Sequence, residues 1–127
     1  MNGSELINTY RAAMFDGAAD MDWLRQGWRA LRHYGRRARA AIEAEDAIAK
    51  AAMIARADEL LTVMSGILNT AEGNTLGTAL MTIYSALRFT LLRANTESSI
   101  AALEDYEAAL AILDRDMMKS SESVLAA

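Results

Sequence analysis

The stretch TLGTALMTIYSALRFTLLRAN, residues 75–95, decides the fold of this 127-residue chain. Apolar side chains recur in it at intervals of three or four residues, which is the repeat of one face of an α-helix. We therefore predict an amphipathic helix over this stretch. Its buried face carries Leu76, Leu80, Ile83, Leu87, Leu91 and Ala94.

Three further segments show the same repeat on either side of that stretch. Residues 98–118 have an apolar stripe and a second face that is rich in Asp and Glu. Residues 22–44 have an apolar stripe and a second face that is lined with arginines. Residues 46–69 begin at Asp46, a residue type that accepts hydrogen bonds from the free N–H groups of a helix start. The connections are short and the chain has no proline. The four helices should therefore double back on one another as an all-α, antiparallel four-helix bundle.

The two ends of the chain carry weaker patterns. Residues 4–14 predict a short additional N-terminal helix, followed by a turn at residues 15–17, Phe-Asp-Gly. Residues 119–127 mix serine, charge and alanine without an apolar stripe, so we expect a disordered C-terminal tail. The prediction is one helical-bundle domain over residues 1–118.

The composition excludes several classes of function. Cysteine is absent, which rules out disulfides and thiol chemistry, and His33 is the only histidine. The carboxylates fall mostly at helix ends or on outward faces, so we expect no catalytic site, metal site or cofactor. The apolar runs are too short to span a membrane, and the N-terminus lacks a signal-peptide pattern. We predict a cytoplasmic protein that is not an enzyme.

Charge is distributed unevenly, although the formal net charge is −4. Residues 97–122 contain seven acids and two bases, whereas residues 23–42 contain six arginines and no acid. The arginines have three possible interpretations. The first is a face that is solvated or paired with the acidic helix, the second is a surface that binds an acidic protein, and the third is a surface that contacts nucleic-acid phosphates. Because the whole chain is acidic, we favour the first interpretation and expect nucleic acid least. These arginines are Arg25, Arg29, Arg32, Arg36, Arg37 and Arg39.

Two glycines and many methionines point to contact surfaces. Gly27 and Gly35 interrupt the arginine-rich helix and are useful where another backbone must come close. The chain has eight methionines, whose flexible side chains adapt to varied partners. Ordinary core filling is the more frequent explanation for such methionines. With Trp23 and Trp28 nearby, the pattern is consistent with a groove that binds a partner helix.

Local signatures, taken in their order and spacing, resemble the flagellar secretion chaperones called FliS over about residues 6–118. The stretch AIEAED, residues 41–46, is similar to that family's helix end and acidic turn. Tyr84 is followed ten residues later by Ala94-Asn95, similar to the family's Leu-Tyr and Ala-Asn signatures. Tyr10 lies 18 residues before Trp28, a spacing similar to that of the family's N-terminal tyrosine.

The resemblance is to a divergent member, because two family motifs are changed. The family's Leu-Tyr-Asp-Gly motif falls on residues 27–30, Gly-Trp-Arg-Ala, where only an aromatic is kept. The family's C-terminal tryptophan is replaced by Met117.

The resemblance implies a four-helix bundle that binds the disordered C-terminal segment of flagellin in the cytoplasm. Such a chaperone prevents premature polymerisation and delivers its client to the flagellar type III export apparatus. The resemblance also implies that the segment around Tyr10 covers part of the client surface until the client displaces it. The alternative is a nucleic-acid-binding or regulatory bundle that uses the arginine-rich helix, and a homodimer stays open. The expected client-binding residues are Tyr10, Trp28, Leu31, Tyr84 and Asn95.

Overall fold

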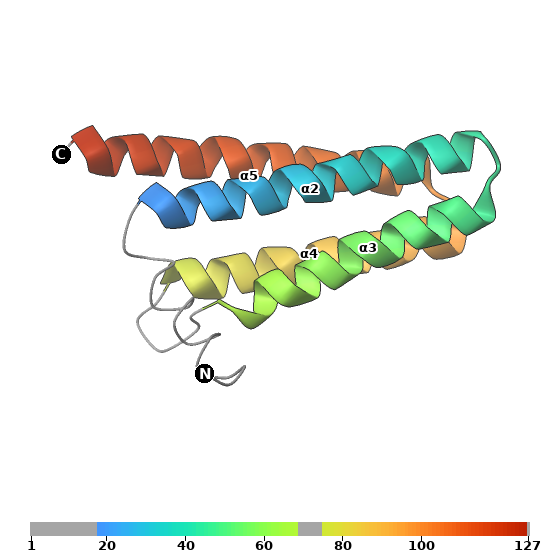
Figure 1. The fold of residues 1–127 in the computed structure, drawn as a ribbon, viewed down its shortest axis with the longest axis horizontal. Helices are drawn as coiled ribbons and strands as arrows, with labels where there is room; N and C mark the ends of the chain where they lie inside the picture. Colours follow the sequence, from blue (N-terminus) through green and yellow to red (C-terminus); the bar gives the residue numbers. More distant parts are fainter. Residues whose placement is uncertain (1–17, 69–74, 127) are drawn as a thin grey trace.

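The structure, a computed structural model, describes residues 18–68 and 75–126, which form four α-helices and no strand (Figure 1). The all-α class is thereby confirmed. The predicted helix over residues 4–14, with Tyr10, lies outside the described residues. Within them, no helix has a stretch long and apolar enough to cross a membrane. The helices are α2 (Ala18–Glu43), α3 (Ala47–Gly66), α4 (Thr75–Glu97) and α5 (Ile100–Ala126).

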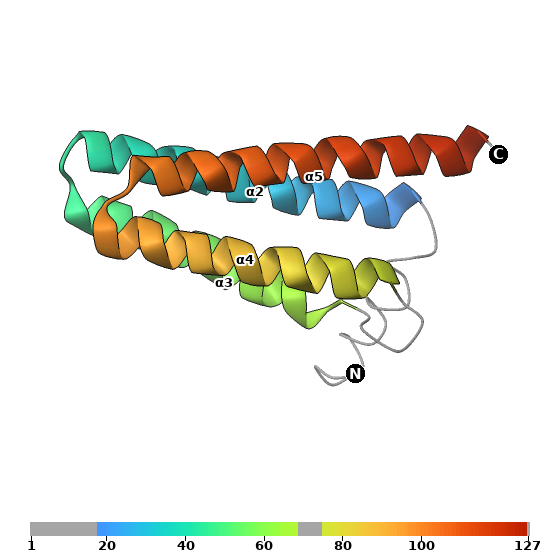
Figure 2. The ribbon, with the colours of Figure 1, turned by 180° about the vertical axis from the view of Figure 1, so that it is seen from behind.

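The helices form the predicted antiparallel bundle, in which each helix packs against two others (Figures 1 and 2). α2 contacts α3 and α5, and α4 contacts the same two helices. α2 and α4 therefore occupy diagonal corners of the bundle. The α2–α3 turn and the α4–α5 turn lie together at one end of it (Figure 1).

Polar side chains define the end of the bundle that holds these two turns. Asp46 caps the start of α3 as predicted, since its Oδ1 accepts a hydrogen bond from the backbone N–H of Ala49 at 3.0 Å. The ammonium Nζ of Lys50 donates to the carbonyl oxygen of Asn95 at 3.0 Å and to the hydroxyl of Ser98 at 2.8 Å. Lys50 thus ties the start of α3 to the last turn of α4 and to the α4–α5 turn.

The helix α5 is longer than its sequence pattern suggests. Its backbone is helical as far as Ala126, whereas we predicted that the helix ends at Met118. Residues 119–126 contain neither proline nor glycine, so nothing in them stops a helix that is already established. The other helix bounds agree with the sequence pattern to within four residues. The division of the chain into a domain and a tail at residue 118 stays a prediction.

The core is built from the predicted apolar stripes. In α4, four of the six stripe positions are buried, and Leu76 and Ile83 pack against the core half-buried. Met64 of α3 is also buried, and Met53 and Met81 pack half-buried against the same cluster, so core filling accounts for these three methionines. Fully burying one such side chain stabilises a fold by about 1.5–3 kcal/mol. The largest fully buried side chains include Leu24, Trp28, Leu31, Leu61, Tyr84 and Tyr106.

The two glycines of α2 make room for side chains of its neighbours rather than for another backbone. A Cβ atom on Gly27 would lie 2.5 Å from Cε of Met64, and one on Gly35 would lie 2.7 Å from Cε1 of Tyr106. The predicted close approach therefore exists, but α3 and α5 make it with a methionine and a tyrosine ring.

Candidate functional site

Three of the expected client-binding residues lie together in the core. Trp28, Leu31 and Tyr84 are all fully buried, and the indole Nε1 of Trp28 donates a hydrogen bond to the phenol oxygen of Tyr84 at 3.0 Å. Asn95 is half-buried near the end of α4, and Tyr10 lies outside the described residues. The folded bundle thus presents only Asn95 of the four described residues to a partner, and a client-binding role for the set stays a prediction.

The two buried tyrosines act as hydrogen-bonding groups and not as acids or bases. Burial raises the pKa of Tyr84 to about 12, and the hydrogen bond from Trp28 offsets only part of that rise. Burial, and next the charge of Glu107, also raise the pKa of Tyr106, whose hydroxyl donates to the carbonyl oxygen of Leu31 at 2.7 Å. Both phenols are therefore neutral at physiological pH. In the part of the chain that the structure describes, no three acidic or histidine side chains are placed to hold a metal ion.

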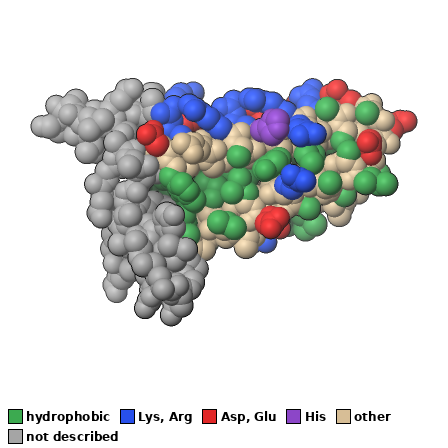
Figure 3. Space-filling view, in the orientation of Figure 1, with side chains coloured by type: hydrophobic (Ala, Val, Ile, Leu, Met, Phe, Trp, Pro, Cys, Tyr) green, Lys and Arg blue, Asp and Glu red, His purple; other side chains and the backbone are tan. Residues whose placement is uncertain are grey.

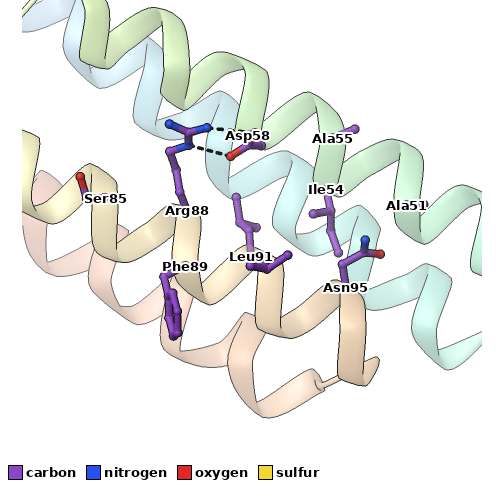
Figure 4. Close-up of a pocket in the computed structure, with 10 residues that line it drawn as sticks. Ala51, Ile54, Ala55, Asp58, Ser85, Arg88, Phe89, Leu91 and Asn95 are labelled. Carbon is purple, nitrogen blue, oxygen red and sulfur yellow. Dashed lines mark hydrogen bonds and ion pairs between the residues drawn. The ribbon is translucent and has the colours of Figure 1, made fainter.

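A groove of about 540 Å³ runs between α3 and α4 (Figure 4). Its floor is apolar, because Ile54 of α3 and Leu91 of α4 belong to the buried core. Ala51 and Ala55 line it from α3, one helical turn apart. Their side chains are single methyl groups, so they leave open the volume of the groove that larger side chains would fill.

The α4 side of the groove carries two large apolar residues on the surface. Phe89 is 70% exposed and Leu92 is 58% exposed, and they lie about one helical turn apart. In Figure 4 the ring of Phe89 points away from α3, at the outer rim of the groove. Single exposed apolar residues are ordinary, but a pair beside an apolar groove is typical of a site that binds another protein.

Polar groups close both ends of this groove. At one end the guanidinium of Arg88 donates to both carboxylate oxygens of Asp58, at 2.8 Å and 3.4 Å, and so bridges α4 to α3 (Figure 4). At the other end lies Asn95, whose backbone carbonyl is held by Lys50. The apolar middle of the groove suits the apolar face of an amphipathic segment.

The arginine-rich helix pairs mainly with the acidic helix, as we predicted. Arg25 contacts Asp114 at 3.3 Å, Arg32 and Arg36 share Glu107 at 3.1 Å and 2.9 Å, and Arg39 contacts Glu104 at 3.3 Å. These pairs form a ladder between α2 and α5. Figure 3 shows the Lys and Arg side chains gathered along the edge of the molecule that α2 occupies. Most of the charge that suggested nucleic acid is therefore neutralised within the bundle.

The sequence reasoning did not single out the α3–α4 groove. The sequence does indicate this groove, because Phe89 and Leu92 lie outside the core stripe of α4. They place two large apolar side chains on the face of α4 that points away from the core. Ala51 and Ala55 gave a weaker sign, since alanine is equally common in helices that bind nothing.

A comparison with protein families decides the identity of the bundle. The family model described as "Flagellar protein FliS" matches residues 10–116. The chain belongs to the flagellar protein FliS family. FliS proteins are flagellar export chaperones for flagellin and are not known as enzymes. A comparison with curated proteins gives no match. The FliS resemblance of the local signatures is confirmed, and the helical bundle agrees with it.

Proposed function

We propose that this FliS protein binds the disordered C-terminal segment of a flagellin in the cytoplasm, with the α3–α4 groove as a contact surface. Binding keeps the flagellin from polymerising prematurely, and the complex is delivered to the flagellar type III export apparatus. The family match over residues 10–116 carries the proposal. The groove is where the geometry supports it best.

The groove can supply the energy that such binding needs. Burying Phe89 and Leu92 under a client would stabilise the complex by about 1.5–3 kcal/mol each. An affinity near 1 μM corresponds to about 8 kcal/mol, so these two anchors provide a large share of it. A disordered client that folds as it binds can present its apolar residues at the spacing the groove requires.

The buried residues of the expected site support the groove indirectly in this proposal. Trp28 and Tyr84 join α2 to α4 across the core, which fixes the position of α4 and with it the exposed pair Phe89 and Leu92. Asn95 lies at the end of the groove, where its side-chain amide can bond to the client backbone.

The test is a titration of the protein with a peptide that covers the C-terminal segment of flagellin. We expect a saturable complex and a circular dichroism spectrum with more helix than the sum of the two components. The double variant Phe89→Ala/Leu92→Ala should weaken the complex by at least about tenfold.

The matched control is Val63→Ala/Ile112→Ala, which removes two exposed apolar residues that do not line the groove. It should change the affinity by less than about twofold, a difference below 0.5 kcal/mol. Equal losses in the two double variants would reject the groove. The absence of any complex at tens of micromolar peptide would reject the chaperone function itself.

A further inference from the structure

Three side chains on the outward face of α2 form a basic stripe: Arg29, His33 and Arg37. All three are exposed, and they follow one another at intervals of four residues, so they lie on the same face of the helix. Eight residues of α-helix separate Arg29 from Arg37, a rise of about 12 Å. The ring of His33 also contacts the ring of Tyr34, with 5.9 Å between the centroids, which places an aromatic surface beside the stripe.

Within the part of the chain that the structure describes, the basic stripe has no counter-ion, unlike the other arginines of this helix. The other four arginines of α2 reach carboxylates of α5. Among the described residues, neither Arg29 nor Arg37 forms an ion pair. No acidic residue occurs in residues 23–42 to supply one within the helix. A positive surface is thus left open on a protein whose net charge is −4.

The basic stripe lies away from the proposed client groove. α2 and α4 occupy diagonal corners of the bundle, and the exposed pair Phe89 and Leu92 belongs to α4. A partner on the outward face of α2 therefore does not compete for the space between α3 and α4.

We infer that the basic stripe docks an acidic helix of a second protein. Carboxylates four residues apart on such a helix match the interval between Arg29, His33 and Arg37. Nucleic acid fits less well, because two arginines neutralise few of the phosphates of a long polyanion. The aromatic ring of Tyr34 adds a surface for the apolar part of a partner side chain.

The test uses a fluorescein-labelled helical peptide of about 20 residues, built from alanine with glutamates at every fourth position, and the full-length protein. We expect saturable binding by fluorescence anisotropy at low salt, and weaker binding as salt is added. Arg29→Gln/Arg37→Gln should weaken the binding by about tenfold, because it removes both exposed ion pairs that the arginines of the stripe can form with the peptide. Saturating the protein with the flagellin peptide should leave the affinity unchanged.

The control variant is Arg93→Gln/Arg115→Gln, which removes the same charge from two exposed arginines on α4 and α5. It should change the affinity by less than about twofold. A peptide with glutamine in place of glutamate should not bind. Equal losses in the two variants, or no saturable binding at millimolar peptide, would overturn the inference. Tighter binding to a 20-nucleotide single-stranded DNA than to the glutamate peptide would assign the stripe to nucleic acid and overturn it as well.

Discussion

Trp28 and Tyr84 are joined by a hydrogen bond of 3.0 Å between the indole nitrogen and the phenol oxygen. Both side chains are fully buried in the core. The bond links the diagonal helices α2 and α4 across the apolar core. A buried polar group is costly when its partner is lost. This pair therefore fixes how the two helices are placed.

Tyr84→Phe should lower the free energy of unfolding by about 1–3 kcal/mol, since it leaves the indole N–H of Trp28 without an acceptor. Tyr106→Phe is the matched comparison. It removes a donor to the carbonyl of Leu31, which lies in the interior of α2 and keeps its helical hydrogen bond, so we expect about 0.5–1.5 kcal/mol. Urea unfolding measures both variants. A Tyr106→Phe variant that is the less stable of the two would contradict this account.

Alkaline pH should destabilise the bundle through its buried phenols. The pKa of Tyr84 rises from 10.0 to about 12 in the folded state, so the folded protein holds that proton more tightly than the unfolded chain does. The stabilisation is complete below pH 10 and is lost as the pH rises from about 10 towards 12, by about 2–3 kcal/mol for this group. The raised pKa of Tyr106 acts in the same direction.

The measurement for this effect is the free energy of unfolding in urea between pH 8 and pH 12. The double variant Tyr84→Phe/Tyr106→Phe has no phenol at either position, so its stability should fall less steeply over this range. Parallel curves for the double variant and the natural protein would show that other groups cause the pH dependence.

Gly35→Ala should destabilise the protein although alanine is the better helix former. The added methyl group would lie 2.7 Å from the buried ring of Tyr106, and overpacking of this kind costs about 1–3 kcal/mol. Gly27→Ala should cost less, because the atoms it meets are the flexible end of Met64. Gly66→Ala meets nothing within 4 Å and should be neutral or slightly stabilising. Thermal unfolding of the three variants measures this order; the Gly35 and Gly27 variants test the packing of α2, and Gly66 of α3 is the control.

Glu107→Gln should lower stability by about 1 kcal/mol at low salt, since one carboxylate serves both Arg32 and Arg36. The loss should shrink when unfolding is repeated in high salt, which screens the pairs of the natural protein. Asp105→Asn is the control, an exposed neighbour that forms no ion pair among the described residues. A loss that is the same at both salt concentrations would mean that Glu107 acts through packing.

Tyr10→Ala should change the affinity for the flagellin segment, in either direction. It should have little effect on the stability of the bundle. The expectation follows from the family resemblance, in which the N-terminal tyrosine covers part of the client surface. Leu87→Ala is the comparison, because Leu87 is a core residue whose truncation should cost about 2–5 kcal/mol. Denaturant unfolding and client titration of both variants separate the two roles. A Tyr10→Ala protein as destabilised as Leu87→Ala would reject the covering role.

The architecture could be predicted from the sequence because burial in a helical bundle repeats every three to four residues. The α4 stripe through Leu80, Leu87 and Leu91 and the start of α3 at Asp46 both follow from local pattern. The pairing of α2 with α5 could also be predicted, because α2 carries a run of arginines and α5 a run of acidic residues. The end of α5 did not follow, because no proline or glycine marks it.

The candidate site was harder to predict because an apolar side chain looks the same in sequence whether it is buried or exposed. Trp28 and Leu31 were expected at a client surface, but both are buried in the core. Phe89 and Leu92 are distinguished from core residues only by their position around α4 relative to its neighbours. Which arginines remain unpaired likewise depends on the register of α2 against α5.

The bundle is closed by an interface between residues that are far apart along the chain. Of the four main helix–helix interfaces in residues 18–68 and 75–126, three join helices that follow one another, and the fourth joins α2 to α5. Arg25 and Asp114, which meet there, are 89 residues apart in sequence. Bringing such distant segments together costs more loop-closure entropy than forming a hairpin. The interfaces between consecutive helices should therefore form early in folding, and the charged ladder between α2 and α5 should be completed last and come apart first.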